Sequence, residues 1–362
     1  MTTTTETGRT DRYEVAVVGG GPAGLTTALY SSRLGHDTVV FDRGGGRSAM
    51  MHNTHNVIGI PESVSGIEFL ETAVDQLRSH DVDVRRAFVS ALDRREDGFE
   101  LETADGTAFA ERVVLATGFT DERPDPPLPR TGRGLHYCLH CDAAMFVDEP
   151  VYVMGHDDSA ASVAMIMLNV TPDVDLLLRG EDPAWSDETD ELLSNHPVDV
   201  VHEDVVGVRN GADGWLEALV FADDGNHQHM DARAESGTDT RTGSGTDARS
   251  DSDDGTVREY AGGFAVYGSR YNNDLAASLG ADLDEEGAVV VDDHGRTSVD
   301  GMYAVGDLTP GHNQVPIAMG QGAKAGIDIH TDLREFPKPP GTIGAADGVD
   351  PGDVPRIANE GD

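Results

Sequence analysis

The sequence predicts an α/β fold with parallel sheets, and two repeated patterns lead to this class. A buried strand at Tyr13–Val18 leads into a glycine-rich turn and a helix at Leu25–Leu34, and a second strand follows at Thr38–Phe41. The same order of strand, turn, helix and strand returns between Val151 and Leu178. Two such units in 362 residues predict parallel sheets with two crevices of the nucleotide-binding type, and a chain of about two domains.

Further elements are expected outside these two units. Apolar runs predict strands at Phe99–Leu101, Val113–Leu115, Gly263–Tyr267, Val289–Val291 and Met302–Val305, and a helix at Gln314–His330. Three segments are almost free of apolar side chains or rich in Pro and Gly. We expect residues 1–12 to be disordered, residues 231–256 to form a mobile acidic loop, and the tail 336–362 to be loose.

The first glycine-rich turn has the spacing of a dinucleotide-binding fingerprint. Gly19, Gly21 and Gly24 follow a strand and open a helix, with Pro22 and Ala23 between the last two glycines. In this context the glycines permit a tight turn, let a pyrophosphate approach the backbone and let helix and strand pack closely. Asp42 follows 18 residues after Gly24, where its carboxylate would accept hydrogen bonds from ribose hydroxyls.

Two later strand ends support a cofactor site. Asp307 follows the strand at 302–305 and Gly306, where a carboxylate can accept hydrogen bonds from the hydroxyls of a polyol chain. Taken alone this is a common strand-end residue. The turn at Thr117 and Gly118, which follows the strand at 113–115, strengthens the interpretation.

The two cysteines of the chain form a single C-x-x-C motif. Cys138 and Cys141 are too few for a disulfide scaffold, so we interpret them as a redox pair. A helix beginning there would favour a thiolate at the first cysteine, and His140 between them would favour it further. Asp142 is suitably placed in the sequence to move protons to or from a departing thiolate.

A metal site is the alternative interpretation of the same motif. Zinc needs four ligands, and with no other cysteine in the chain it would have to recruit histidines such as His136 or His156.

The charge of the chain excludes several classes of function. Lys plus Arg number 26 against 66 Asp plus Glu, a formal net charge of −40, and no cluster of basic residues could bind nucleic acid phosphates. The longest apolar run, 160–168, is far shorter than the roughly 20 residues that span a bilayer, so no membrane association is expected. We expect a cytoplasmic protein of halophilic type, because carboxylates keep a surface hydrated in strong salt; an ordinary acidic protein is the alternative.

The motifs together resemble the low-molecular-weight thioredoxin reductase family of flavoproteins. The resemblance rests on the fingerprint at 19–24, the turn at 116–118, the cysteine motif through Asp142, and Ser159, Gly306–Asp307 and 313–315, in that order. It covers roughly residues 13–330. It implies two Rossmann-like three-layer domains, one inserted in the other, with FAD as cofactor and a homodimer as the assembly.

The resemblance also assigns domains and residues. It implies an FAD domain formed by 13–123 and 263–335, and an inserted NAD(P)-binding-like domain at 124–262 that contains the redox disulfide. Cys138 would exchange with the partner protein, Cys141 would face the flavin, and Asp142 would be the acid or base. Family residues that contact the isoalloxazine correspond to Asn56, Gln314 and Val315.

The second nucleotide crevice departs from the family pattern. Asp157 stands where a pyrophosphate would need glycine, and Asp158 adds charge beside it. Arg179 matches the first arginine that the family uses for the 2′-phosphate, but the others are replaced, and Glu181 and Asp182 add repulsion. These residues weigh against NADPH as the electron donor.

We therefore expect an FAD-dependent, thioredoxin-reductase-like enzyme. It would exchange electrons between flavin and the Cys138–Cys141 disulfide, and then with thioredoxin or a small dithiol. Reduced ferredoxin would suit a degenerate nucleotide site as donor. A flavin-dependent dithiol oxidase using oxygen and a non-enzymatic flavin redox sensor are the alternatives.

Overall fold

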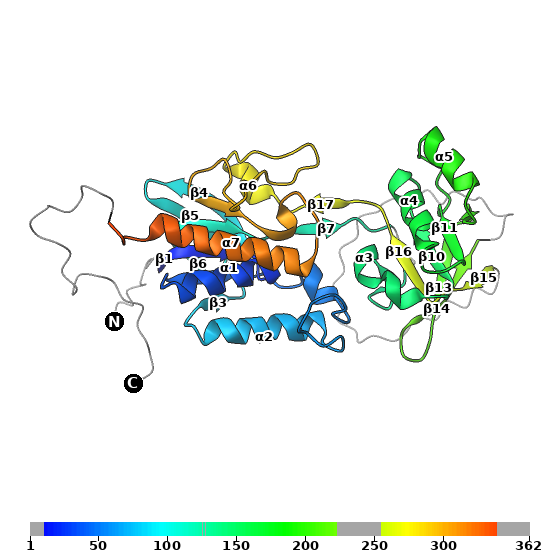
Figure 1. Ribbon diagram of the computed structural model, residues 1–362, viewed down its shortest axis with the longest axis horizontal. Helices are drawn as coiled ribbons and strands as arrows, with labels where there is room; N and C mark the ends of the chain where they lie inside the picture. Colours follow the sequence, from blue (N-terminus) through cyan, green and yellow to red (C-terminus); the bar gives the residue numbers. More distant parts are fainter. Residues whose placement is uncertain (1–10, 125, 127, 223–254, 339–362) are drawn as a thin grey trace, which may run out of the picture. The chain divides into compact units, whose positions relative to one another are not determined.

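The computed structural model describes residues 11–124, 126, 128–222 and 255–338, and it divides the chain into two compact units. Unit 1 combines both ends of the chain, residues 1–121 and 269–362, and unit 2 is the segment 122–268 between them (Figure 1). Each unit is built on a sheet that contains parallel strands and is covered by helices, which confirms the predicted α/β class.

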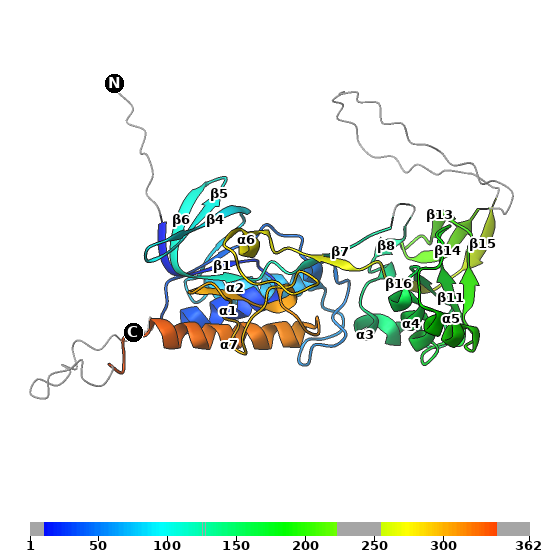
Figure 2. The same cartoon turned by 90° about the horizontal axis from the view of Figure 1, so that it is seen from above.

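Unit 1 is built on a seven-stranded sheet. Its strands run in the order β3-β2-β1-β6-β5-β4, and β18 pairs with the end of β6. Parallel pairing joins β1, β2, β3, β6 and β18. An antiparallel meander is formed by β4, β5 and β6 (Figure 2). The bounds are β1 (Asp11–Val18), β2 (Thr38–Phe41), β3 (Asp83–Arg85), β4 (Val89–Arg95), β5 (Gly98–Thr103), β6 (Gly106–Leu115) and β18 (Met302–Ala304).

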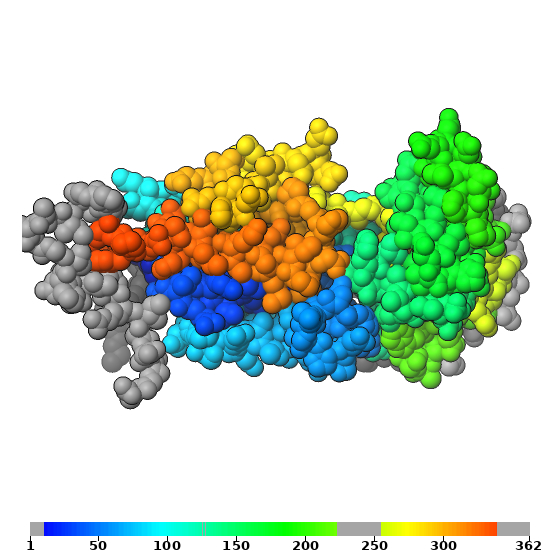
Figure 3. Space-filling view, viewed as in Figure 1, coloured from blue at the N-terminus to red at the C-terminus, as the bar shows by residue number. Residues whose placement is uncertain are grey.

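The helices of unit 1 complete two apolar cores, one on each face of this sheet. They are η1 (Arg47–Met50), α1 (Pro22–Arg33), α2 (Gly66–Arg78), α6 (Asp274–Ser278), η3 (Gly306–Leu308) and α7 (Val315–Leu333). On one face α7 lies beside α1 in all views, and the two form adjoining surfaces in Figure 3. Close approach is possible because α7 presents Gly322 and Gly326 to the backbone of α1.

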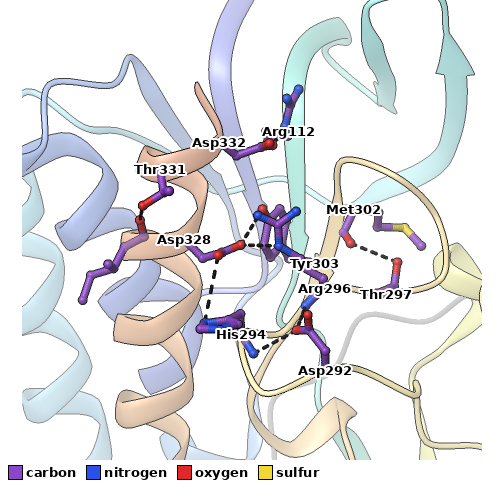
Figure 4. A network of polar contacts seen from close by, with 11 residues as sticks. Arg112, Asp292, His294, Arg296, Thr297, Met302, Tyr303, Asp328, Thr331 and Asp332 are labelled. Carbon is purple, nitrogen blue, oxygen red and sulfur yellow. Dashed lines mark hydrogen bonds and ion pairs between the residues drawn. The ribbon is translucent and has the colours of Figure 1, made fainter. Parts of the chain in front are cut away.

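A network of polar contacts holds α7 to the sheet and to the loop before β18 (Figure 4). Asp328 of α7 accepts hydrogen bonds from Arg296 Nε at 2.6 Å and from the Tyr303 hydroxyl at 3.0 Å. One turn on, Asp332 accepts from Arg112 of β6 at 2.6 Å. Burial and Asp328 raise the pKa of Tyr303, which keeps its hydroxyl a proton donor. The network fixes the C-terminal helix against strands from both parts of unit 1.

Unit 2 has a six-stranded sheet in the order β12-β11-β10-β16-β9-β8, and all of its paired strands are parallel. An antiparallel sheet of three strands lies in the same unit, in the order β13-β14-β15. The strand bounds are β8 (Arg130–Thr131), β9 (Gly134–His136), β10 (Val151–Met154), β11 (Val174–Leu177), β12 (Asp199–Val201), β13 (Val205–Asn210), β14 (Leu216–Phe221), β15 (Thr256–Glu259) and β16 (Gly262–Ala265). The helices are α3 (Leu139–Asp142), η2 (Ala143–Phe146), α4 (Asp158–Met167) and α5 (Asp187–Ser194).

Where the chain leaves and re-enters unit 1, two short strands pair antiparallel. These are β7 (Phe119–Asp121) and β17 (Ser269–Tyr271). The predicted return to the first domain at 263 is therefore wrong by about six residues. Val151–Met154 and Gly262–Ala265 pair residue by residue, so the strand at 262–265 belongs to the sheet of unit 2.

Three other expectations need correction. Asp11 and Arg12 are part of β1, because they extend its pairing with β6, so the expected disordered N-terminus is too long by two residues. Thr256 opens β15 against β14, so the expected acidic loop ends earlier than 256. The predicted strand at 289–291 is reduced to an isolated bridge between Leu283 and Val289. Of the segments expected to lack regular structure, residues 1–10, 231–254 and 339–362 lie outside the described residues.

Candidate active site

The parallel strands of unit 1 end at one edge of the sheet, and the candidate cofactor residues follow directly from those ends. Strands β1, β6 and β18 finish at Val18, Leu115 and Ala304. Their registers place these ends side by side, since Val18 is paired with Leu115, and Leu115 with Ala304. The segments 19–24, 116–118 and 305–307 therefore meet at the carboxyl edge of the sheet, where α/β folds bind nucleotides.

The glycine-rich turn has the close packing that its spacing predicts. Gly19 has a φ of 115°, and a Cβ there would lie less than 3.0 Å from the carbonyl oxygen of Ala116. A Cβ on Gly24 would meet the Gly19 carbonyl oxygen just as closely. Gly21, by contrast, has no atom within 4 Å of a built Cβ, and it caps α1 without a side-chain hydrogen bond. Open space at the N-terminus of a helix fits a pyrophosphate group.

Asp42 lies at the end of β2, as predicted for a ribose-binding carboxylate. Its Oδ1 accepts a hydrogen bond from the backbone N–H of Gly20 at 3.1 Å. One oxygen of Asp42 therefore holds the glycine-rich turn. The same side chain leaves no room for a Cβ at Gly20, which would lie 2.7 Å from its carboxyl carbon.

The residues around Asp307 gather at the same edge. Gly306 has a φ of 70°, and a Cβ on it would lie 2.7 Å from the Cβ of Ala23 in α1. A Cβ on Gly118 would lie 3.9 Å from the Cβ of Asp307. Burial raises the pKa of Asp307, although Arg47 lowers it. A desolvated carboxyl group at a nucleotide crevice fits hydrogen bonding to the hydroxyls of a polyol chain.

Two residues that support this edge were not identified from the sequence. Asn272 accepts through its backbone oxygen from the Thr117 hydroxyl at 2.7 Å and donates from Nδ2 to the Thr117 carbonyl at 2.9 Å. Arg47 lies 2.9 Å from Asp121 and over the ring of Phe119. Neither residue belongs to a motif, and only the pairing of β7 with β17 brings Asn272 to the turn.

Two candidate flavin-contact residues are brought together although 258 positions separate them. Asn56 donates from Nδ2 to Oε1 of Gln314 at 2.7 Å. Gln314 caps α7, and Val315 is the first residue of that helix. A polar contact thus joins the loop around Asn56 to the start of α7 within unit 1.

The cysteine motif of unit 2 is a disulfide at the start of a short helix. Cys138 and Cys141 are joined with their Cα atoms 5.3 Å apart, and Cys138 caps α3, as predicted. His140 is exposed. Asp142 ends the helix and accepts a hydrogen bond at 2.8 Å from Nδ1 of His136, which the sequence suggested only as a possible zinc ligand. Within the described residues no group of three or more His, Cys, Asp or Glu side chains could hold a metal ion.

The second of the two predicted nucleotide crevices lies in unit 2, and its acidic residues make hydrogen bonds within the protein. Asp157 caps α4 and accepts from the N–H of Ala160 at 2.9 Å. Asp158 accepts from Ser186 and Thr189 of the α5 region, which hold its pKa below the usual range. Arg179 is 7% exposed, and its Nε lies 3.7 Å from Asp204.

Two of these residues carry the prediction about NADPH. Asp157 accepts a hydrogen bond at the N-terminus of α4, the end of a helix at which pyrophosphate groups commonly bind. The arginine expected to face the 2′-phosphate lies inside unit 2.

Comparison with known proteins assigns the chain to a family. Residues 13–322 match the family model of pyridine nucleotide-disulphide oxidoreductases. The chain belongs to this family. It is 27% identical over 331 residues to a thioredoxin reductase of Peptoclostridium litorale, covering 90% of this chain and 98% of the relative. This similarity confirms the predicted resemblance to low-molecular-weight thioredoxin reductases.

Other relatives are longer. The chain is 27% identical over 322 residues to an NADH dehydrogenase of Bacillus subtilis, a match that covers 87% of this chain but only 57% of the relative. The chain therefore spans little more than half the length of some curated relatives.

The fold has close counterparts among solved structures. The thioredoxin reductase of Streptococcus pyogenes superposes with a TM-score of 0.75 at 25% identity, covering 91% of this chain and all of the other. This likeness confirms the predicted pair of Rossmann-like domains. In the part of the chain that the structure describes, no helix has the length and apolar character needed to cross a membrane.

Proposed function

We propose that the chain is an FAD-dependent, thioredoxin-reductase-like oxidoreductase. In this proposal it exchanges electron pairs between flavin in unit 1 and the Cys138–Cys141 disulfide in unit 2, and then with thioredoxin or a small dithiol. The observation that supports it most directly is the disulfide itself, formed by the two cysteines of a C-x-x-C turn that continues into Asp142. When bound, FAD would supply the transfer of an electron pair to or from a sulfur.

The residues of unit 1 would hold the cofactor. The open N-terminus of α1 at Gly21 would receive the pyrophosphate, and Asp42 would accept from the ribose. Asp307 would accept from the ribityl hydroxyls, and Asn56 with Gln314 would border the ring system.

The residues of unit 2 would perform the thiol chemistry. Cys138 would form the mixed disulfide with the substrate, and Cys141 would be the leaving sulfur. Asp142 would hold and transfer the proton that this exchange moves, while the exposed His140 would favour the thiolate. The proposal places the protein in the cytoplasm, where a thioredoxin partner would be found, and gives it the homodimeric assembly implied by the family.

We propose further that NADPH is not the electron donor. The Asp157 carboxylate already satisfies the N-terminus of α4, and Arg179 lies buried near Asp204. A one-electron carrier such as reduced ferredoxin, or a dithiol, would deliver electrons without using this crevice.

A donor screen tests both parts. The purified, FAD-loaded chain is mixed anaerobically in high salt with NADPH, NADH, reduced ferredoxin or dithiothreitol, and bleaching of the flavin is followed by stopped flow. We expect rapid bleaching by ferredoxin or the dithiol only. Rapid bleaching by NADPH would refute the proposal that NADPH is not the donor. If none of the donors bleaches the flavin, the proposal that the chain is an oxidoreductase is refuted.

A cysteine variant tests the site. Cys138→Ser should bind FAD as the wild type does, because the residues proposed to hold FAD belong to unit 1, and should lose exchange with thioredoxin or dithiothreitol. The matched control is Ser159→Ala, a hydroxyl removed elsewhere in unit 2. Exchange that persists in Cys138→Ser would remove this cysteine from the mechanism.

A further inference from the structure

A buried histidine is bonded to the acidic residue of the disulfide turn. His136 is the last residue of β9, where its backbone pairs with Phe264 of β16. Its side chain is 4% exposed, and its Nδ1 lies 2.8 Å from Oδ2 of Asp142, which is 22% exposed. The contact therefore ties the helix of the disulfide to the central sheet of unit 2.

The opposite edge of the imidazole lies in apolar surroundings. The ring packs edge-on against Phe146 with centroids 5.3 Å apart, and at a tilt against Phe264 with centroids 6.0 Å apart. Within the described part of the chain, Nε2 is buried and has no hydrogen-bond partner. Among these contacts from α3, η2 and β16, Asp142 is the one charged group that faces the ring; the other two are phenyl rings.

This environment distinguishes between the possible positions of the proton. If the proton is on Nδ1, the histidine donates to an ionised Asp142, and Nε2 leaves only a lone pair unsatisfied. If the histidine is doubly protonated, or if Asp142 is the proton donor, Nε2 carries an N–H that is buried without an acceptor. An unsatisfied buried donor is costly, so the first arrangement is favoured.

We propose that His136 is a positioning residue for the thiol–disulfide chemistry: it holds the Asp142 side chain in place and fixes one carboxylate oxygen, which leaves the other for proton transfer. The inference rests on the proposed role of Asp142 as acid and base. It gives a function to a residue that no motif identifies.

The exchange with an external dithiol shows where the proton moves. Asp142 takes the proton from the first external thiol, and the resulting thiolate attacks the sulfur of Cys138. The bond between Cys138 and Cys141 breaks, and Cys141 leaves as a thiolate that receives the proton back from Asp142. The second external thiol then gives up its proton and attacks the external sulfur of the mixed disulfide, and Cys138 leaves as a thiolate that takes up this proton. The external dithiol loses two electrons and two protons, and the cysteine pair gains both.

Two substitutions separate positioning from packing. His136→Asn keeps an N–H donor near the place of Nδ1, whereas His136→Leu fills a similar volume without a donor. The exposed His196 of unit 2, which contacts the carbonyl oxygen of Leu192, provides the control variant His196→Leu.

The experiment measures reduction of the disulfide in the FAD-loaded chain by dithiothreitol between pH 5 and 9. Free thiols are trapped with a maleimide and assigned to Cys138 and Cys141 by mass spectrometry. We expect His136→Leu to slow reduction about tenfold, because the Asp142 carboxylate loses the hydrogen bond that fixes it.

The remaining variants give the comparison. His136→Asn and His196→Leu should stay within about twofold of the wild type, with unchanged profiles. His136→Leu combined with Asp142→Asn should be no slower than Asp142→Asn alone, since the two residues act together.

Two results would overturn the inference. These are equal slowing in both His136 variants and additive losses in the double variant. Each can occur while the wild type exchanges normally, so they leave the proposed function intact. A wild type that does not exchange with dithiothreitol would refute the proposed function itself and this role with it.

Discussion

The close packing of α7 on α1 can be tested by adding a single methyl group. In Gly322→Ala the new Cβ would lie less than 3.0 Å from the backbone oxygen of Ala23 and 3.1 Å from Cβ of Thr26. Because the nearest atom belongs to the backbone of α1, the two helices must separate by about 1 Å to restore ordinary carbon–oxygen contact. The same glycine is where α7 crosses the first turn of α1, next to the candidate pyrophosphate site.

The expected change in the free energy of unfolding is the sum of two opposing effects. Overpacking of this kind costs about 1–3 kcal/mol, and because the obstacle is backbone we expect the upper part of this range. Alanine recovers up to about 1 kcal/mol through its higher helix propensity. Gly322→Ala should therefore lower the free energy of unfolding of unit 1 by about 1–2 kcal/mol. In Gly320→Ala, where no atom lies within 4 Å of the new Cβ, only the propensity gain remains, about 0.5–1 kcal/mol of stabilisation.

The two units can be followed separately during unfolding in urea. Both tryptophans of the chain, Trp185 and Trp215, lie in unit 2, so their fluorescence is an internal control that neither substitution should change. Far-UV circular dichroism includes the helices of unit 1 and should report the difference. We also expect weaker FAD binding in Gly322→Ala. If the unfolding midpoint of Gly322→Ala equals that of Gly320→Ala, the close approach of α7 and α1 does not restrict the size of the side chain at position 322.

Other predictions concern single polar contacts. Asp328→Ala should cost about 2–4 kcal/mol in urea unfolding, because the buried Tyr303 hydroxyl loses its acceptor (Figure 4); a change below about 1 kcal/mol would contradict this. Burial and the neighbouring His36, 3.0 Å away, lower the pKa of His330 from 6.5, so the unfolded chain binds more protons there. Its contribution to stability is complete above about pH 6.5 and is lost as the pH falls below that value. His330→Asn should therefore show a smaller drop in urea midpoint between pH 7 and 5, and an equal drop would rule out this group as the cause. Asp157→Gly should retain the fold, since glycine replaces aspartate at a helix cap for a few tenths of a kcal/mol, and should bind NADPH more tightly than the wild type in a fluorescence titration; unchanged binding would exclude the carboxylate as the barrier.

Local motifs were predictable because their chemistry depends on neighbours in the chain. The glycines at 19, 21 and 24 are required by a turn of six residues, and the structure has the strand before it and the helix after it. The disulfide joins residues three apart, so its turn needs no distant partner. Element boundaries were less certain, as the strand at 262–265 shows: its place depends on pairing with β10, more than a hundred residues earlier.

By itself, then, the sequence determined the α/β class, the two strand–turn–helix units and the cysteine pair, because short-range spacing and apolar patterning specify these. Only the tertiary structure decided that Asn56 contacts Gln314, that Asn272 holds the Thr117 turn, and that His136 bonds Asp142. Even that last pair, six residues apart, depends on long-range packing. His136 faces Asp142 because β9 lies in the sheet beside β16, where its imidazole packs against the rings of Phe146 and Phe264. Hydrogen bonds of this kind are set by the positions of backbones that the sheet brings together, and no local pattern records them.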